Sequence, residues 1–372
     1  AEHISFPLLV RPSYVLGGRG MAIVYDNDQL DKYMAEAAKI SPDHPVYLDR
    51  FLESAIEVDV DALCDGKDVF VGGILEHIEM AGIHSGDSAC CTPPFSLSLS
   101  LQGQLRDIAR RLALRLGVVG LLNIQFAIKD QVIYVIEANP RASRTVPFVS
   151  KSTGVPLAKI AARIMAGEKL ADLHLPADDR EFDYFCVKEA VMPFGRFPGS
   201  DVVLGPEMKS TGEVMGIAGN FPAAFTKTQL AIDYEPPRGG EVFISVNDGD
   251  KRNITAIARS IARLGFSLVA TTGTARALRA SGIECEEVGK IHAGSHTILD
   301  RIASGEIVLM INTPFGSSTN TDGYEMRAAC VRHGVSYCTT LAGAQALIAG
   351  MEAVRETGLD VIALQDLPQW EG

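Results

Sequence analysis

The stretch 134–145 carries residue types suited to phosphate transfer, because an apolar strand ends in metal-seeking oxygens and two arginines follow at once. Side chains alternate along a strand, so Glu137 and Asn139 point to the same side. A proline then ends the strand and leaves Arg141 and Arg144 in a loop. Carboxylate and amide oxygens can hold Mg²⁺, and guanidinium groups can bind a phosphoryl group. A strand end with solvated polar residues remains the alternative.

The expected strands 122–128 and 132–137 form a hairpin that adds a third oxygen ligand. A loop of three residues between them puts Gln125 and Glu137 on one face, whereas a loop of two puts them on opposite faces. We therefore predict the three-residue loop. With Asn139, these side chains then form an oxygen-rich patch for one or two Mg²⁺ ions.

Two other segments could contribute to such a site. Glycines lie between Arg11 and Arg19, where a loop could place backbone N–H groups over phosphates, although neither P-loop nor dinucleotide-binding spacing is present and a hairpin turn is the alternative. Glu57, Asp59 and Asp61 alternate with valines, which is also the pattern of the solvated face of a half-buried strand.

Composition describes an ordinary globular protein of 372 residues, long enough for two or three domains. A formal charge of −12 argues against nucleic acid as a partner. We find no apolar run long enough for a membrane span and no signal peptide, so we expect a cytoplasmic protein without a membrane partner. Seven cysteines without a C-x-x-C motif indicate reduced thiols rather than zinc or disulfides.

Up to about residue 145 the pattern is mixed and predicts a largely antiparallel sheet with helices on one side, an α+β layout. Residues 155–168 are typical of a further helix, whereas 170–235 are irregular and rich in proline and glycine. The predicted strands are 6–11, 20–25, 45–51, 56–63, 68–75, 122–128 and 132–137, and the predicted helices are 27–39 and 101–116.

After the linker 233–240, strands and helices alternate, which predicts a parallel sheet with helices on both faces and ligands at the carboxyl ends of its strands. The predicted strands are 241–246, 266–271, 307–312 and 335–339, and the predicted helices are 251–264, 275–281, 323–333 and 341–357.

Four motifs taken together resemble the ATP-grasp unit of carbamoyl-phosphate synthase large subunits. They are R-P-S-Y-V-L-G-G-R at 11–19, E-V-D-V-D at 57–61, G-I-H-S-G-D-S at 82–88 and E-A-N-P-R-A-S-R-T-V-P-F-V-S-K at 137–151. The alternating region is similar to the methylglyoxal-synthase-like regulatory domain that follows the second such unit. The resemblance implies the C-terminal half, which phosphorylates carbamate with ATP in pyrimidine and arginine biosynthesis.

The resemblance also assigns residues by matching position. It gives the metal ions to Gln125, Glu137 and Asn139, and the phosphates or reacting group to Arg11, Arg19 and Arg141. The ATP site would contain Asp49, Leu52, Glu57, Gly82, Ile83, His84 and Ser85, together with Gln125 and Glu137. The implied cofactors are ATP with Mg²⁺ or Mn²⁺.

Effector residues follow in the same way. Positions for nucleotide monophosphates such as UMP or IMP match Lys251, Thr271, Thr274, Lys290 and Asn312. Positions that bind ornithine in some relatives match Glu79, Asp87, Glu189 and Thr339 or Thr340. Pro314 replaces a threonine that related enzymes can carry, and 293–296 lack the catalytic carboxylate of methylglyoxal synthase, so the last domain reads as a sensor.

We thus expect a partial α+β ATP-grasp domain at 1–160, its extension and linker at 161–235, and an α/β doubly wound, methylglyoxal-synthase-like allosteric domain at 236–372. The expected partners are the remainder of the large subunit and a glutaminase small subunit. Because the pattern starts within a domain, we expect a fragment that is inactive alone. The alternatives are a catalytically silent nucleotide-monophosphate-binding module and another ATP-grasp carboxylate ligase.

Overall fold

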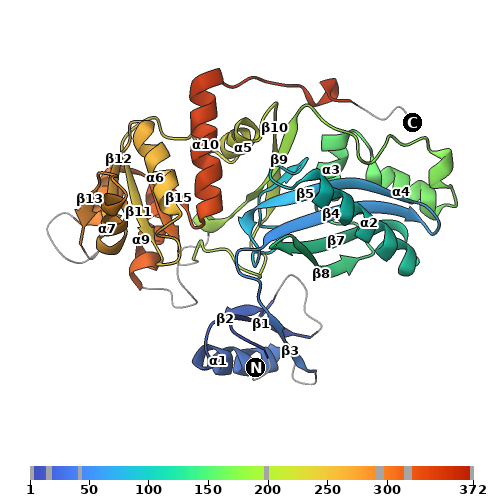
Figure 1. Ribbon diagram of the computed structural model, residues 1–372, viewed down its shortest axis with the longest axis horizontal. Helices are drawn as coiled ribbons and strands as arrows, with labels where there is room; N and C mark the ends of the chain where they lie inside the picture. Colours follow the sequence, from blue (N-terminus) through green and yellow to red (C-terminus); the bar gives the residue numbers. More distant parts are fainter. Residues whose placement is uncertain are drawn as a thin grey trace.

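The computed structural model describes residues 4–13, 19–40, 44–196, 201–289, 297–313 and 321–368. Their strands form three sheets (Figure 1). The first sheet has the order β2-β1-β3 and is antiparallel, with the helix α1 packed against it. These elements are β1 (Leu8–Pro12), β2 (Ala22–Val24), α1 (Asn27–Ile40) and β3 (Val46–Arg50).

The second sheet is antiparallel, with seven strands in the order β10-β9-β6-β5-β4-β7-β8. Its central strands are long and buried, and β8 and β10 are its edges. The strands are β4 (Ile56–Asp65), β5 (Val69–Met80), β6 (Cys90–Thr92), β7 (Val119–Lys129), β8 (Val132–Asn139), β9 (Phe185–Val191) and β10 (Gly212–Ala218).

Helices cover both faces of the large sheet, so the prediction of helices on one side was wrong. The helix α2 (Leu99–Arg115) packs on the face that carries Val58, Val60 and Phe126. Two shorter helices, α3 (Val146–Thr153) and α4 (Leu157–Met165), pack with Leu63 and Leu75 on the opposite face. The helix α3 has only 8 residues before Gly154, which is too short a segment for helical periodicity to be recognised in the sequence.

The hairpin β7–β8 closes with a two-residue turn and not with the predicted loop of three. Asp130 and Gln131 have φ values of 50° and 65°, and Lys129 pairs with Val132. Positive φ at both central residues is the geometry of a type I′ hairpin turn. A bulge near Gln125 supplies the odd residue instead, so that Gln125 pairs directly with Glu137.

The region 170–235 is more regular than its composition predicted. It contains β9 and β10, which extend the large sheet, and the helix α5 (Phe221–Ala231) that packs on them. Strand β9 carries the buried Lys188 beside Glu189, which breaks the apolar alternation by which a strand is recognised.

The third sheet is parallel, with the order β13-β12-β11-β14-β15 and helices on both faces, as predicted. The strands are β11 (Glu241–Val246), β12 (Ser267–Thr271), β13 (Glu286–Val288), β14 (Ile307–Thr313) and β15 (Ser336–Cys338). The helices are α6 (Ile254–Arg263), α7 (Thr272–Ala280), α8 (Ile298–Ser304), α9 (Thr321–His333) and α10 (Leu341–Thr357).

One hydrophobic core joins the large sheet to the parallel sheet. The helices α5 and α10 pack side by side between them (Figure 1), and Phe225 and Met351 belong to the same buried cluster. After α10 the chain returns to the large sheet, where Leu367 is buried in the cluster formed with α3 and α4. None of the described helices is long and apolar enough to cross a bilayer.

Candidate nucleotide, metal and effector sites

Polar side chains line one face of the large sheet in two rows that cross β4, β7 and β8. The first row consists of Asp59, Gln125 and Glu137, which are paired directly across the three strands. Directly opposed residues of antiparallel strands point to the same face. Glu137 is exposed, Gln125 is half-buried, and the Gln125 amide donates to Ser85 Oγ at 2.7 Å.

The second row consists of Asp61, Asn123 and Asn139, two positions further along each strand. Asn139 Nδ2 donates to Glu137 Oε1 at 2.7 Å, which links the two rows. The predicted ligands Gln125, Glu137 and Asn139 therefore lie together at the end of the hairpin.

These oxygens suit a hard cation. Among the described residues, no group of three histidine, cysteine or acidic side chains could hold a metal ion. The candidate set has two amides and one carboxylate, and Mg²⁺ is commonly bound by one or two carboxylates together with water and substrate phosphates. The residues present therefore fit Mg²⁺ delivered with a nucleotide.

The acids of the motif at 57–61 are buried, so their interpretation as a solvated strand face was wrong. Asp59 Oδ2 lies 3.0 Å from His77 Nε2 inside the sheet. Burial lowers the pKa of His77, but the hydrogen bond and charge of Asp59 outweigh this effect and raise it. Burial, with the charge of Asp59 as a lesser cause, raises the pKa of Glu57 to about 7, although the charge of His77 acts to lower it.

The loop 81–88 lies beside these rows. Gly82 has φ of +109°, and a Cβ there would lie 2.7 Å from Phe51 Cζ, so only glycine fits. The backbone N–H of Gly82 donates to Glu57. His84 Nδ1 accepts from Gly86 N at 3.0 Å, and burial lowers the pKa of His84. Ile83 is half-buried in the same loop.

The remaining predicted nucleotide residues belong to the small sheet and the chain that leaves it. Arg11 on β1 forms an ion pair of 2.9 Å with Asp49 on β3, and both side chains are about half exposed. Leu52 is half-buried just after β3, and Arg19 is exposed. Arg11 and Asp49 are thus adjacent, although the resemblance assigns Arg11 to the phosphates or reacting group and Asp49 to the ATP site.

The arginine loop follows β8, with Arg141 and Arg144 both exposed. Arg141 Nη1 donates to the Ala142 carbonyl at 3.1 Å, and Arg144 Nη1 donates to Ser210 Oγ at 3.4 Å. Neither guanidinium has a carboxylate among its described partners, which leaves both available for an anion.

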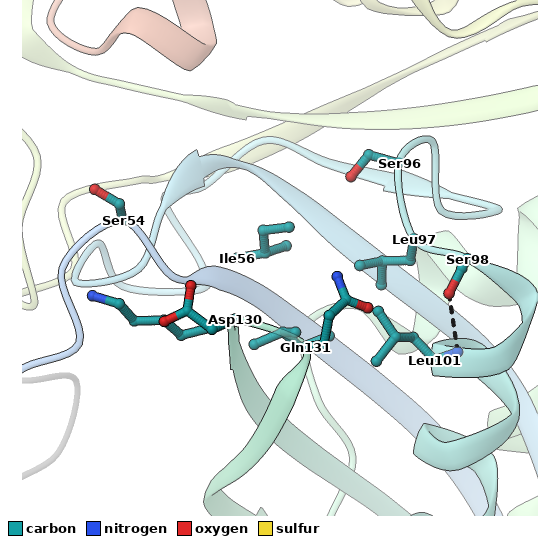
Figure 2. A pocket seen from close by; sticks show the side chains of 10 residues that line it. Ser54, Ile56, Ser96, Leu97, Ser98, Leu101, Asp130 and Gln131 are labelled. Carbon is teal, nitrogen blue, oxygen red and sulfur yellow. Dashed lines mark hydrogen bonds between the residues drawn. The ribbon is translucent and has the colours of Figure 1, made fainter.

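A cavity of about 320 Å³ lies on the opposite face of the large sheet (Figure 2). Its lining includes Ile56 on β4, Ile128 on β7 and Ser98, the N-cap of α2. Because side chains alternate along β4 and β7, Glu57 and Gln125 face away from it. None of the predicted site residues lines this cavity.

In the parallel sheet, four predicted effector residues gather at the carboxyl ends of β11, β12 and β14. Thr271 Oγ1 donates to Ser245 Oγ at 3.4 Å and to Thr274 Oγ1 at 3.3 Å. Asn312 Nδ2 donates to the Ser245 carbonyl at 3.1 Å. The end of Lys251 reaches Gly273, where it would meet an added Cβ. Strand order reverses at β11, which is where such sheets bind ligands.

Two residues and one segment of the predicted effector domain fall outside the part of the chain that the structure describes. They are Lys290, Pro314 and the segment 293–296. Whether Lys290 joins the other effector residues therefore stays a prediction.

Three of the predicted ornithine residues belong to the large sheet. Glu79 lies on β5, Glu189 lies on β9, and Asp87 lies in the loop between β5 and β6. Burial raises the pKa of Glu189 to about 8, with the Glu79 carboxylate as a further cause, so the two acids are close. Glu79 Oε2 accepts from Ala89 N at 2.8 Å, and Glu189 Oε2 accepts from Gln229 Nε2 at 3.1 Å. Asp87 accepts from the backbone N–H groups of 209 and 210.

Threonines 339 and 340 directly follow β15, and Thr340 caps α10 by accepting from Gly343 N at 3.1 Å. Burial is the main cause of the raised pKa of Cys338, and the charges of Glu79 and Glu189 are further causes. Glu79 and Glu189 therefore lie near the end of β15, between the large sheet and the parallel sheet.

Sequence reasoning missed several polar residues of these sites, including His77, Asn123 and Arg327. Asn123 could have been found, because it stands two residues before Gln125 on the same strand and so shares its face. Arg327 has no local signal, since its partner Asp201 lies 126 residues away.

Two family models match this chain. The ATP binding domain of the carbamoyl-phosphate synthase L chain matches residues 1–173, and the MGS-like domain matches residues 253–339. The first match contains the two polar rows and the arginine loop, and the second contains most of the parallel sheet. Both agree with the resemblance inferred from the motifs.

Curated relatives match the whole chain. It is 54% identical over its full length to the carbamoyl phosphate synthase large chain of Methanothermobacter thermautotrophicus, covering 35% of that protein. It is 53% identical over 99% of its length to the large chain of Pasteurella multocida, covering 34% of it. The chain thus spans about a third of the length of these relatives.

Among solved structures, the biotin carboxylase domain of 2-oxoglutarate carboxylase from Hydrogenobacter thermophilus, in complex with MgADP and bicarbonate, matches with a TM-score of 0.51. The identity is 20%, and the match covers 63% of this chain and 58% of that one, which shows a shared fold. The two domain matches and the relatives along its full length agree that this chain carries an ATP-binding domain of the carbamoyl-phosphate synthase L chain followed by an MGS-like domain.

Proposed function

We propose that this chain supplies the carbamate-phosphorylating site of a carbamoyl-phosphate synthase large chain. The reaction transfers the γ-phosphoryl group of ATP to carbamate and yields carbamoyl phosphate and ADP. The observation that carries the proposal is the pair of polar rows, which places Gln125, Glu137 and Asn139 on one face beside the arginine loop.

The described residues support this role by charge and position. Gln125, Glu137 and Asn139 would hold Mg²⁺, or Mn²⁺ in its place, which when bound neutralises phosphate charge. Arg141, with Arg11 and Arg19 on the small sheet, would bind phosphate oxygens and the reacting group.

Around the nucleotide, the loop 82–85 would contact adenosine together with Asp49, Leu52 and Glu57. A buried carboxyl with a pKa of about 7, as in Glu57, can accept a hydrogen bond when ionised or donate one when neutral. Preorganised dipoles and cations lower the cost of moving charge during phosphoryl transfer. Keeping water out protects carbamate and acyl phosphates from hydrolysis.

The test is carbamoyl phosphate formation by the complete large chain, assembled with the glutaminase small subunit that we propose as its partner. Glu137→Ala is expected to reduce formation by at least about a thousandfold, because it removes the one carboxylate of the metal set. The matched control Glu213→Ala removes an exposed carboxylate from the opposite edge strand β10 and should leave the rate unchanged. Equal rates for Glu137→Ala and wild type would refute the site.

We also propose that these 372 residues make no carbamoyl phosphate without the rest of the large chain. The assay is ATP- and metal-dependent formation of carbamoyl phosphate by the isolated chain. Turnover that disappears in Glu137→Ala would contradict this proposal while supporting the site itself. We also propose a cytoplasmic location for this protein.

The MGS-like domain is proposed to bind a nucleotide monophosphate such as UMP or IMP through Lys251, Thr271, Thr274 and Asn312, with Lys290. The support is the convergence of these hydroxyl and amide groups at the switch point of the sheet. Calorimetry with UMP and IMP tests it. Lys290→Ala should weaken binding at least about tenfold by removing a cation from the phosphate, and unchanged heats would exclude Lys290 from the site.

A second effector site, for ornithine, is proposed at Glu79 and Glu189, with Asp87 and Thr339 or Thr340. Its support is the raised pKa of these two half-buried, neighbouring acids, because an ammonium group between them would relieve their repulsion. Glu189→Gln should abolish the heat of ornithine binding and leave that of UMP or IMP unchanged. Equal ornithine binding by the variant would rule the site out.

A further inference from the structure

Asp61 is a buried carboxylate that the proposed reaction does not use directly. It lies on β4 with its side chain fully enclosed. Oδ1 accepts from Asn123 Nδ2 at 3.0 Å and from Ser143 Oγ at 2.7 Å. Oδ2 accepts from Thr145 Oγ1. Two of these three donors lie in the loop that follows β8, more than 80 residues away in sequence.

An ionised carboxylate suits these partners because it only accepts hydrogen bonds. Two hydroxyls and one amide N–H point at it, and hydrogen bonds to a charged acceptor are about twice as strong as neutral ones. An asparagine at position 61 would offer one acceptor oxygen, and its NH₂ group would face donors. Substitution by asparagine therefore preserves volume and removes the bonding pattern.

The loop that Asp61 holds is the one that carries Arg141 and Arg144. Ser143 lies between the two arginines, and Thr145 directly follows the second. Thr145 precedes α3 but makes no side-chain cap to that helix, so its hydroxyl serves Asp61 instead. Ser143 and Thr145 also contact each other at 2.8 Å. The anchor therefore lies at the centre of the arginine loop.

We propose that Asp61 is a positioning residue that fixes the loop 140–145 so that its arginines face the phosphates of the nucleotide. The anchoring is a statement about the folded chain, whereas the identity of the anion rests on the proposed function. The hydrogen bonds of Asp61 go to Asn123, Ser143 and Thr145 and not to the metal set, so it acts through the loop.

Trypsin tests the anchoring directly, because it cleaves after Arg141 and Arg144. In the wild-type chain the anchored loop should resist cleavage, and in Asp61→Asn the rate at these two bonds should rise at least about tenfold, since loss of charged hydrogen bonds lowers the cost of local opening. Fragments are identified by mass spectrometry. Equal rates in Asp61→Asn and wild type would overturn the inference.

The matched control is Asp65→Asn on the same strand. Asp65 is also buried, and its oxygens accept from the backbone N–H groups of Lys67, Asp68 and Leu170 at 2.7–2.9 Å. It anchors a different loop, so its variant should lose thermal stability but keep the wild-type cleavage rate at Arg141 and Arg144. Faster cleavage in both variants would reduce Asp61 to a general structural role and overturn the inference.

A second variant covers the case in which Asp61→Asn does not fold. Ser143→Ala combined with Thr145→Val removes both loop donors and leaves the bond of Asp61 to Asn123 intact. It should reproduce the faster cleavage of the loop. Unchanged cleavage in this variant would equally contradict the anchoring role.

Calorimetry with MgADP tests whether the arginines face the phosphates, separately from whether Asp61 anchors the loop. Asp61→Asn should bind MgADP at least about tenfold more weakly than wild type, and Asp65→Asn should bind like wild type. If wild type binds no MgADP, the proposed function fails for this chain while the trypsin comparison still decides the anchoring. If the loop is cleaved faster but the affinity is unchanged, the positioning role is wrong.

Discussion

The buried ion pair between Arg327 and Asp201 should contribute more stability than any exposed pair in the chain. Arg327 lies on α9 and is 3% exposed, while Asp201 belongs to the segment between β9 and β10. The guanidinium donates from Nε at 2.8 Å and from Nη2 at 2.6 Å to the two carboxylate oxygens, and from Nη1 at 2.7 Å to Asn312. The pair thus joins the MGS-like domain to the ATP-binding unit.

Arg327→Met removes the cation and leaves the Asp201 carboxylate, which is 19% exposed, without it. Breaking a buried pair by removing one partner costs about 3–5 kcal/mol. Because Asp201 keeps some contact with water, we expect a loss of about 3 kcal/mol, at the lower end of that range. The measurement is urea unfolding followed by far-ultraviolet circular dichroism, with calorimetry to detect separate domain transitions.

A double-mutant cycle with Asp201→Asn isolates the interaction between the two side chains. The double variant should be no less stable than Arg327→Met alone, so that the coupling is at least as large as the cost of Asp201→Asn alone. The control is Arg279→Met, which breaks an exposed ion pair of 3.0 Å with Glu287 in the same domain and should cost at most about 1 kcal/mol. Additive losses in the cycle, or equal losses for both arginines, would refute the reasoning.

Three further predictions follow from the backbone and from burial. Gly82→Ala should cost about 1–3 kcal/mol by calorimetry because of its positive φ and the ring of Phe51, whereas Gly103→Ala, with nothing within 4 Å, should gain about 0.5–1 kcal/mol. Gln131→Gly should raise the free energy of unfolding by about 0.5–1 kcal/mol, because φ is +65° there, and a loss would contradict the type I′ turn. Burial raises the pKa of Glu189 to about 8, so the folded chain binds more protons than the unfolded one and loses stability as pH rises through 8. Between pH 6 and pH 9 the melting temperature of Glu189→Gln should fall less than that of wild type. An equal fall would show that ionisation of Glu189 is not the cause.

Local patterns predicted most of the regular elements. The strand at 241–246 and the helix at 341–357 agree with the structure at both ends, because alternation and helical periodicity are written in neighbouring residues. The parallel sheet followed from the order of strands and helices alone, and the motifs around Glu137 pointed to phosphate chemistry before any contact was known.

The candidate site was predicted in its residue types and less well in its geometry. Gln125 and Glu137 share a face as expected, but a bulge in the hairpin brings this about and the predicted loop was wrong. A bulge and a third loop residue shift the alternation equally, so the pattern could not separate them. The strand β9 was missed because Lys188 interrupts the apolar pattern inside the sheet.

The sequence by itself determined which residues could hold a metal ion and bind phosphate, since these depend on side-chain chemistry and on spacing along one strand. Only the tertiary structure decided that Glu57, Asp59 and Asp61 are buried and that Asp61 holds the arginine loop. An acid on one face of a strand is solvated or enclosed according to what covers that face. For Asp61 the hydrogen-bond donors come from segments more than 60 residues away, whose approach no local pattern records.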